Sequence, residues 1–200
     1  GRNAALIAAA ERNDLAGVEQ LLKDGADANA RDALGNRPLL HAARLGATEM
    51  ARQLLEAGAD PNFKGRGYTP LGLAALNSHP GVADWLLQFG AFTTARGDNG
   101  LTPLMNAALL NNVAVMHVIL RHDPDVDYEN SAGRTALSYA AEGGAEQAIE
   151  LLLGRGAAIN AVDKKFNTAL FWAALRDQRG AVRLLLRQGA DQGAVSLDLL

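Results

Sequence analysis

Apolar residues recur at intervals of three and four along several short stretches of this 200-residue chain. Met50, Leu54 and Leu55 follow this spacing, and so do Val182, Leu185 and Leu186. Residues three or four positions apart share one face of an α-helix, so each stretch predicts a short helix with one buried stripe. Glycine follows most of these stretches, because it accepts the left-handed conformation that ends a helix. These glycines are Gly25, Gly58, Gly90, Gly156 and Gly189.

A second motif precedes these stretches and combines Thr or Pro with Leu and an Ala-Ala pair. Its copies are "RPLLHAA" at 37–43, "TPLGLAA" at 69–75, "TPLMNAA" at 102–108, "TALSYAA" at 135–141 and "TALFWAA" at 168–174. Successive copies start 32, 33, 33 and 33 residues apart. Proline suits the first turn of a helix, and alanine lets neighbouring helices approach closely. Each unit is therefore predicted to be a turn, a short helix, a tight connection, a longer helix and a loop.

The period and the T-P-L motif resemble the ankyrin-repeat family, in which a β-turn and two helices repeat every 33 residues. The resemblance implies an all-α fold, a solenoid of stacked helix-turn-helix units with short β-hairpin-like turns. The resemblance covers residues 3 to about 193, and we expect a single ankyrin-repeat domain over residues 1–200. The expected repeats are 3–31, 32–63, 64–96, 97–129, 130–162 and 163–193, followed by a short C-terminal cap helix at 194–200.

The sequence departs from the family pattern in two ways. The histidine of the motif is replaced by Leu40, Gly72, Met105, Ser138 and Phe171. The fourth unit ends in "HDPD", so Asp123 stands where the other units have their capping glycine. We expect that junction to be the most irregular one.

Charge and composition exclude several classes of function. The formal net charge of −3 provides no general attraction for nucleic acid or an anionic membrane. The chain has no cysteine, which excludes disulfides, thiolate catalysis and Cys-based zinc sites and permits a periplasmic or secreted location as well as a cytoplasmic one. No apolar run reaches the roughly 18 to 20 residues that cross a bilayer. The excess of arginine over lysine, with abundant alanine, favours a bacterial source.

Catalytic chemistry has little support in the sequence. His41, His79, His117 and His122 are interpreted as structural or solvated, because none has metal-ligand spacing to Cys, Asp or Glu. A metal shared by His117 and His122 is an open alternative. The glycines of "KGRGYTP" are explained by a turn, and no phosphate-binding or nucleophile motif is present. We therefore predict no catalytic residue, no metal site and no cofactor.

The resemblance implies that a partner contacts the hairpin tips and the concave face of the first helices. Residues predicted there are Arg31, Leu34, Arg44, Leu45, Arg66, Tyr68, Leu76, Arg96, Leu101, Leu109, Leu110, Arg134, Lys164, Lys165, Trp172, Leu175 and Arg176. The leucines either form an apolar binding strip or cover one another and the loops. Trp172 is either core or partly exposed, and the mixed chemistry at its equivalent positions favours solvent.

The predicted function is a non-catalytic, monomeric scaffold that binds a protein with an acidic surface and an apolar centre. The basic tips and the acidic second helices predict this charge complementarity. Alternatives are a targeting domain of a larger enzyme or effector, a bacterial inhibitor or immunity-type protein, a periplasmic accessory protein, and a metabolite-binding solenoid that uses Tyr139, Phe171 and Trp172. Nucleic acid and membranes are not expected partners.

Overall fold

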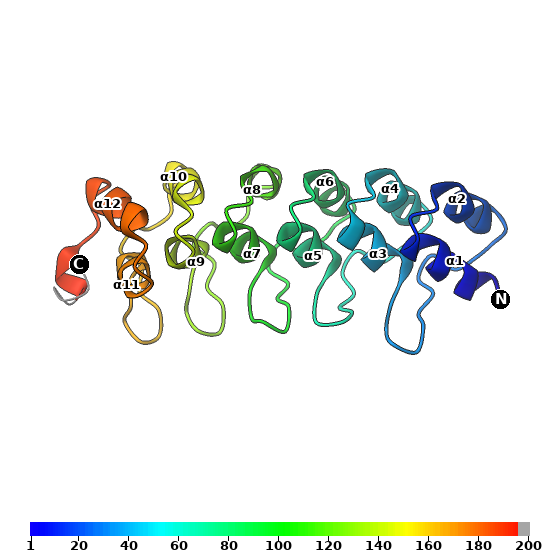
Figure 1. Ribbon diagram of the computed structural model, residues 1–200, viewed down its shortest axis with the longest axis horizontal. Coiled ribbons are helices and arrows are strands. Elements are labelled where there is room, and N and C mark those ends of the chain that lie inside the picture. Colours follow the sequence, from blue (N-terminus) through cyan, green and yellow to red (C-terminus); the bar gives the residue numbers. More distant parts are fainter. Residues whose placement is uncertain (196–200) are drawn as a thin grey trace. The chain divides into compact units, whose positions relative to one another are not determined.

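The computed structural model describes residues 1–195 and divides into two compact units, Gly1–Asn99 and Gly100–Leu200. Each unit is a stack of helix pairs connected by extended loops (Figure 1). Within each unit, the first helices of the pairs form one row, the second helices form another, and the hairpin loops project beyond the first helices. The all-α class and the stacked helix-turn-helix units expected from the sequence are confirmed.

Unit 1 contains three helix pairs. Its helices are α1 (Arg2–Glu11), α2 (Leu15–Lys23), α3 (Pro38–Leu45), α4 (Thr48–Glu56), α5 (Pro70–Leu76) and α6 (Pro80–Gln88). The first helices α1, α3 and α5 pack in sequence, and the second helices α2, α4 and α6 do the same. Each repeat therefore buries its apolar stripe against the next one, as stacked repeats require.

Unit 2 repeats this arrangement. Its helices are α7 (Pro103–Leu109), α8 (Val113–Arg121), α9 (Ala136–Glu142), α10 (Glu146–Gly154), α11 (Ala169–Leu175) and α12 (Arg179–Arg187). A 3-10 helix, η1 (Gln192–Ala194), follows. The cap helix expected at 194–200 falls mainly on residues 196–200, outside the described residues.

Threonine starts the first helix in four of the repeats, as the motif predicts, and three of these threonines cap the helix with their side chains. The hydroxyl oxygens of Thr69, Thr102 and Thr168 accept hydrogen bonds from the backbone N–H three residues later, at 3.0, 3.3 and 3.3 Å. These bonds satisfy donors that the first turn of a helix leaves unpaired. Proline follows Thr69 and Thr102 at the first helical position. The motif therefore fixes where each first helix begins.

The interior is made of alanines from the first helices and leucines from the second helices. The Ala-Ala pairs at 42–43, 74–75, 107–108 and 140–141 are fully buried, and so are Leu54 and Leu152. The predicted stripe of the last helix is partly wrong: Leu185 is buried, whereas Val182 and Leu186 are half-buried. In the described chain, α12 packs on α10 and α11 and has no following repeat to cover these two side chains.

The helix ends at the capping glycines as predicted, since Gly25, Gly58, Gly90, Gly156 and Gly189 all have φ between 87° and 96°. Asp123 takes the same conformation, with φ 51°. The junction predicted to be irregular keeps this left-handed conformation but loses one hydrogen bond. Pro124 has no N–H, whereas the alanine that follows each of the five glycines donates to the carbonyl five residues earlier. A side chain with positive φ also crowds its own backbone, so Asp123 costs stability.

Replacing Asp123 by glycine is therefore expected to raise the free energy of unfolding by about 0.5 to 1 kcal/mol, because glycine adopts φ > 0 without a Cβ penalty. Urea denaturation followed by far-UV circular dichroism measures the change. The converse variant, Gly156→Asp, is a matched control, since Gly156 has φ 87° and an added Cβ there meets no atom within 4 Å. If Asp123→Gly does not stabilise the chain, the Asp123 backbone carries no strain.

Asparagine side chains connect the loop of one repeat to the loop of the next. In unit 1, Asn62 donates from Nδ2 to the Gly90 carbonyl at 3.0 Å and accepts from the Phe92 N–H at 2.8 Å. Asn29 makes the same pair of bonds with Gly58 and Asp60. These bonds hold neighbouring hairpins of a unit side by side, which positions the exposed tips.

Candidate functional site

The residues predicted to contact a partner differ in exposure. Those exposed in the structure are Arg31, Leu34, Arg44, Arg66, Arg96, Leu110, Lys164, Lys165, Leu175 and Arg176. Half-buried ones are Leu45, Tyr68, Leu76, Leu109 and Trp172. Leu101 and Arg134 are buried, with 8% exposure each, so their predicted exposure at the tips is wrong. Leu101 directly precedes the capping Thr102 of α7 and lies with it in the interior.

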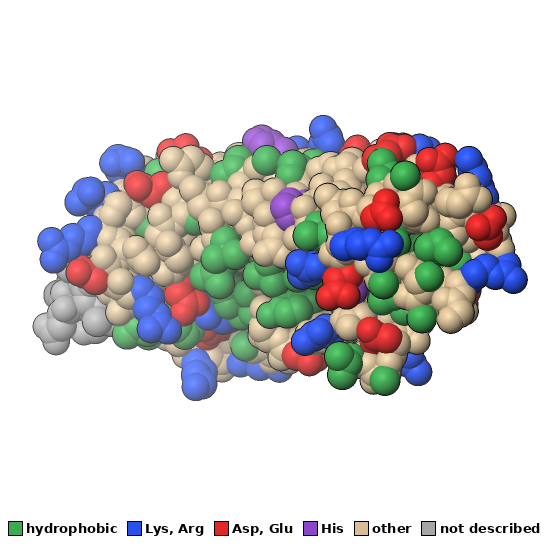
Figure 2. Space-filling model, turned by 45° about the vertical axis from the view of Figure 1, so that its right-hand side comes forward, with side chains coloured by type: hydrophobic (Ala, Val, Ile, Leu, Met, Phe, Trp, Pro, Cys, Tyr) green, Lys and Arg blue, Asp and Glu red, His purple; other side chains and the backbone are tan. Residues whose placement is uncertain are grey.

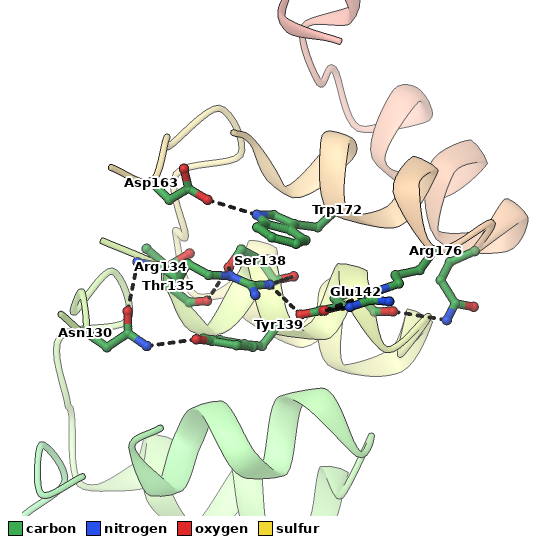
Figure 3. Close-up of polar contacts among 10 residues, drawn as sticks. Asn130, Arg134, Thr135, Ser138, Tyr139, Glu142, Asp163, Trp172 and Arg176 are labelled. Atoms are coloured by element: carbon green, nitrogen blue, oxygen red, sulfur yellow. Dashed lines mark hydrogen bonds and ion pairs between the residues drawn. The ribbon is translucent and has the colours of Figure 1, made fainter. Parts of the chain in front are cut away.

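Arg134 is buried because its guanidinium lies between two aromatic rings of unit 2. Its Cζ is 3.8 Å from the centroid of Tyr139 and 3.9 Å from the centroid of Trp172 (Figure 3). Nε donates to the Ser138 hydroxyl at 3.0 Å, and Nη2 lies 2.7 Å from a carboxylate oxygen of Glu142. Stacking, hydrogen bonds and an ion pair together fix the side chain. The buried Arg134 side chain therefore supports the first helices of unit 2 and is not part of their exposed surface.

The outer parts of this cluster connect two repeats of unit 2. Arg176, at the end of α11, reaches the second oxygen of Glu142 at 3.1 Å. Gln178 donates from Nε2 to the backbone carbonyl of Glu142 at 3.0 Å. Glu142, the last residue of α9, thus receives contacts from Arg134 in the hairpin before α9 and from the α11–α12 connection (Figure 3). The arrangement is a rigid platform, since each charged group in it has an opposite charge or a hydrogen bond.

The polar ends of the ring side chains contact the hairpin that precedes their own helix. Asn130 donates from Nδ2 to the Tyr139 hydroxyl at 2.8 Å, and the Trp172 Nε1–H donates to Asp163 at 3.0 Å. Trp172 is partly exposed, as the mixed chemistry at its equivalent positions predicted, but that chemistry does not indicate solvent at all of those positions. His41, Asn106 and Tyr139 are buried, and Leu73 and Trp172 are half-buried.

Unit 1 has a cavity of about 230 Å³ on the side of its first helices. Its walls come from α3, from α5 and from the hairpin that precedes each of these helices. The lining residues are Asn36, Leu40, His41, Arg44, Gly65, Arg66, Tyr68 and Leu73. We call this the unit 1 pocket. The leucine and tyrosine side chains make its surface mainly apolar, and the two arginines supply its charge.

A tight turn positions one of these arginines. Gly65 and Tyr68 exchange backbone hydrogen bonds at 2.9 and 3.1 Å, and the two residues between them have φ 55° (Arg66) and 88° (Gly67). Positive φ at both central residues is the geometry of a hairpin turn that favours Asn or Gly. Arg66 is strained by comparison, and its Nη1 lies 3.4 Å from the Asn36 side-chain oxygen. The sequence motif "KGRGYTP" therefore forms a turn, as interpreted.

The second arginine of the unit 1 pocket lies beside a buried histidine. Arg44 Nη2 is 3.4 Å from Nδ1 of His41, and His41 is only 7% exposed. Burial, followed by the nearby charge of Arg44, lowers the pKa of His41 from its ordinary value, so the ring is neutral at pH 7. Its Nε2 is buried and has no hydrogen-bond partner among residues 1–195. A buried donor without a partner is rare in proteins.

Sequence reasoning missed one exposed aromatic residue at a hairpin tip. Phe166 is 78% exposed and has φ 62°. It occupies the position that Gly133 takes in the preceding hairpin, and glycine is the residue suited to this conformation. Lys164 and Lys165 precede it and are exposed. The sequence does contain a signal for Phe166, because the hairpin "DKKFN" at 163–167 has phenylalanine where the hairpin "NSAGR" at 130–134 has glycine.

The charge separation expected between basic tips and acidic second helices holds only in part. On the face shown in Figure 2, charges of both signs are interspersed near the N-terminal end, and several Lys and Arg side chains gather near the C-terminal end. The second helix α12 carries exposed Arg179, Arg183 and Arg187 and no acidic residue. Acidic second helices are therefore not a general property of this chain.

Residues 1–195 contain no group of three or more His, Cys, Asp or Glu side chains placed to hold a metal ion. No helix in that range is long and apolar enough to cross a membrane.

Curated proteins match parts of the chain. The 2-5A-dependent ribonuclease of Mus musculus is 41% identical over 76 residues, which are 37% of this chain and 10% of that protein. The cyclin-dependent kinase 4 inhibitor B of Rattus norvegicus is 42% identical over 62 residues, 31% of this chain and 47% of the inhibitor. The chain spans a tenth or less of the length of the first relatives matched, and the matches do not test a bacterial source.

Among solved structures, the ankyrin-repeat domain of Bcl-3 aligns with a TM-score of 0.84 and 29% identity. The alignment covers 94% of this chain and 87% of that domain. The family model for ankyrin repeats in three copies matches residues 6–97 and again 104–196. Since these two matches include nearly every repeat predicted from the sequence, the chain belongs to the ankyrin-repeat family.

Proposed function

We propose that this chain is a non-catalytic, monomeric scaffold that binds a protein partner through its hairpin tips and the exposed faces of its first helices. Ankyrin repeats are protein–protein interaction modules, and the described residues contain no cluster that could hold a catalytic metal. The proposal adds the surface and the character of the partner. The observation that carries it is the exposure of Phe166 in a strained conformation.

Phe166 brings the folded chain no evident stability. Its ring is exposed, and a bulky residue at positive φ costs about 1 to 2 kcal/mol of backbone strain. Strained residues that persist in a fold are concentrated at functional sites. Aromatic side chains, Phe included, are enriched at the buried centres of protein interfaces. These features support insertion of Phe166 into an apolar pocket of the partner.

Other exposed apolar side chains accompany Phe166 on the same kinds of element. Leu34, at the first hairpin of unit 1, is 73% exposed. Leu110 and Leu175, at the ends of α7 and α11, are 49% and 46% exposed. These leucines occupy different positions of their repeats, so the binding-strip interpretation is supported by several exposed apolar side chains on hairpins and helix ends and not by one repeated position.

The partner is proposed to present acidic groups around an apolar centre. Arg31, Arg96, Lys164 and Lys165 are exposed on the hairpins, and none of them forms an ion pair among residues 1–195. Unpaired basic tips increase the association rate with an acidic surface more than they increase affinity. With a Debye length of about 8 Å at physiological salt, association should slow as salt rises while dissociation changes less.

The test uses a partner isolated with the immobilised chain, purified, and measured by surface plasmon resonance. Phe166→Gly is expected to raise the free energy of unfolding by about 1 kcal/mol through relief of strain and to weaken binding at least about tenfold through loss of the ring. Greater stability together with weaker binding is a combination that a structural role for Phe166 does not produce.

Phe166→Ala is the matched control, because it removes the ring and keeps a Cβ in the strained conformation. It should weaken binding as much as Phe166→Gly without the gain in stability. Unchanged dissociation constants for both variants would refute the proposed role of Phe166. Salt-independent association rates would refute the acidic character of the partner.

A second candidate role follows from the lengths of the relatives. The matched proteins include a ribonuclease, and this chain corresponds to only 10% of it. A targeting domain within a larger enzyme or effector would use the same binding surface. The inhibitor and accessory roles expected from the sequence would use the same binding surface. They differ from the targeting role only in whether an enzyme or effector domain adjoins the repeats.

A further inference from the structure

The unit 1 pocket has a counterpart at the same repeat positions in unit 2. Arg134, Ser138, Tyr139 and Glu142 lie 98 positions after Asn36, Leu40, His41 and Arg44. In the following repeat of each unit, Trp172 lies 99 positions after Leu73, and Lys165 lies 99 positions after Arg66. The two places can therefore be compared residue by residue, although each belongs to its own unit.

In unit 2 this place is filled from within the chain. The Arg134 guanidinium is stacked between Tyr139 and Trp172, and its charge meets Glu142 at 2.7 Å. The repeat geometry thus creates a slot between the first helices of adjacent repeats. In unit 2 the slot holds a planar group between two side chains, and a charged residue lies at one end of it.

In unit 1 the side chains that would fill the slot are shorter. Asn36 stands in place of Arg134, and Leu73 in place of Trp172, which leaves the cavity of about 230 Å³. The charge at the end of the slot is reversed, because Arg44 stands in place of Glu142. A group that fits this slot must therefore be apolar in its body and negative where it meets Arg44.

The arginines of the unit 1 pocket are not neutralised by the chain. Arg44 and Arg66 form no ion pair among residues 1–195, and their polar contacts are the long ones to His41 and Asn36. Glu11 and Asp32 lie near enough to raise the pKa of His41 slightly against its overall lowering. The Asp32 carboxylate already accepts the N–H groups of Leu34 and Asn36 and the Asn36 amide, all at 2.9 Å.

His41 also differs from the equivalent residues of unit 2 in its hydrogen bonds. Tyr139 and Trp172 each hydrogen-bond the residue nine positions earlier, Asn130 or Asp163. The residue nine positions before His41 is Asp32, whose carboxylate is taken by Asn36 instead. Since a guanidinium can only donate, the contact of Arg44 with Nδ1 favours the tautomer protonated at Nε2, and Nε2 has no hydrogen-bond partner within residues 1–195.

We propose that the unit 1 pocket binds an acidic peptide segment of the protein partner, which inserts one apolar side chain between His41 and Leu73 and presents a carboxylate to Arg44 and Arg66. The inference rests on the proposed function and specifies its chemistry in unit 1. The apolar walls favour an aliphatic or aromatic side chain over a phosphate, and the two arginines favour an adjacent carboxylate. A rigid cavity between two helices loses little conformational entropy when it is filled.

The test transfers the unit 2 arrangement into unit 1. The variant Asn36→Arg, Arg44→Glu, Leu73→Trp should fill the cavity with its own arginine, as Arg134 does. The probes are fluorescein-labelled synthetic peptides with a central leucine flanked by Asp and Glu, and the same peptides with Asn and Gln flanks. Fluorescence polarisation should show that the wild type prefers the acidic peptides and that the filled variant binds them at least about tenfold more weakly.

A second variant guards against misfolding of the first. Arg66→Gly removes one guanidinium and suits the backbone, since Arg66 has φ 55°. It should remain folded and lose most of the preference for acidic flanks. Lys23→Gln, on the exposed end of α2, changes the net charge by −1, as the filled variant does, and should bind the acidic peptides like the wild type.

Equal binding of acidic and amide peptides, or undiminished binding by both pocket variants, would overturn the proposal. The isolated protein partner separates this failure from a failure of the proposed function. If the partner binds the filled variant as tightly as the wild type but loses affinity for Phe166→Gly, the scaffold function stands and the pocket is not its contact.

Discussion

Alanine in place of Leu152 is expected to lower the free energy of unfolding by about 2 to 5 kcal/mol, the range for a buried leucine that leaves a cavity. Leu152 is fully buried in α10, which packs against α8, α9 and α12. Shortening this side chain therefore leaves a cavity inside unit 2. Urea denaturation with far-UV circular dichroism gives the change.

Leu110→Gln is the control for exposure. Leu110 is 49% exposed at the end of α7, and surface substitutions usually stay within about 0.5 kcal/mol. The control should therefore leave the stability nearly unchanged while weakening partner binding. A loss of stability as large as that of Leu152→Ala would assign Leu110 to the core and remove it from the binding surface.

The repeats could be predicted from the sequence because each helix start, helix end and buried position depends only on nearby residues. Thr69 and Pro70 fix the start of α5 through one hydrogen bond and one ring, and Gly58 fixes the end of α4 through its own backbone freedom. Leu54 and Leu152 are buried because their spacing places them on the inner face of a helix. None of these features requires knowledge of a distant contact.

The environment of Arg134 could not be predicted in the same way. Arginine at a hairpin is usually exposed, and Arg134 is buried only because Trp172, 38 positions later, closes the second side of its slot. The unit 1 pocket has the same origin, since Asn36 and Leu73 come from different repeats. Local patterns identify the positions, but the contents of each slot depend on which pair of side chains the stacking brings together.

Asp123 and Phe166 show a different limit of sequence reasoning. Both occupy glycine positions, and the sequence pattern therefore predicts an irregularity at Asp123. The structure keeps a positive φ at both, 51° and 62°, although Pro124 removes one hydrogen bond from the turn at Asp123. Stacking against neighbouring repeats outweighs a local strain of about 1 to 2 kcal/mol. At these two positions, a residue that replaces the glycine of the motif is consequently strained, while the left-handed conformation is kept.

Alanine in place of Arg134 is expected to destabilise the chain by about 1.5 to 3 kcal/mol, because it removes charge-assisted hydrogen bonds inside the fold while Glu142 keeps its contact with Arg176. The Arg134 and Glu142 side chains are only 10% and 16% exposed. The substitution also removes the group stacked between Tyr139 and Trp172 and the hydrogen bonds to Ser138. Urea denaturation measures the loss, and Trp172 fluorescence should report the opened slot directly.

Arg176→Ala is the matched control, because Arg176 contacts the same Glu142 carboxylate from an exposed position. Exposed ion pairs contribute about 0 to 1 kcal/mol, so this variant should stay close to the wild type in stability. Arg134→Lys keeps the charge but lacks the planar group that stacks between the rings, and should fall between the two. If Arg134→Ala is as stable as Arg176→Ala and instead loses affinity for the partner, Arg134 contacts the partner as the sequence predicted, and the stacked cluster does not hold the platform together.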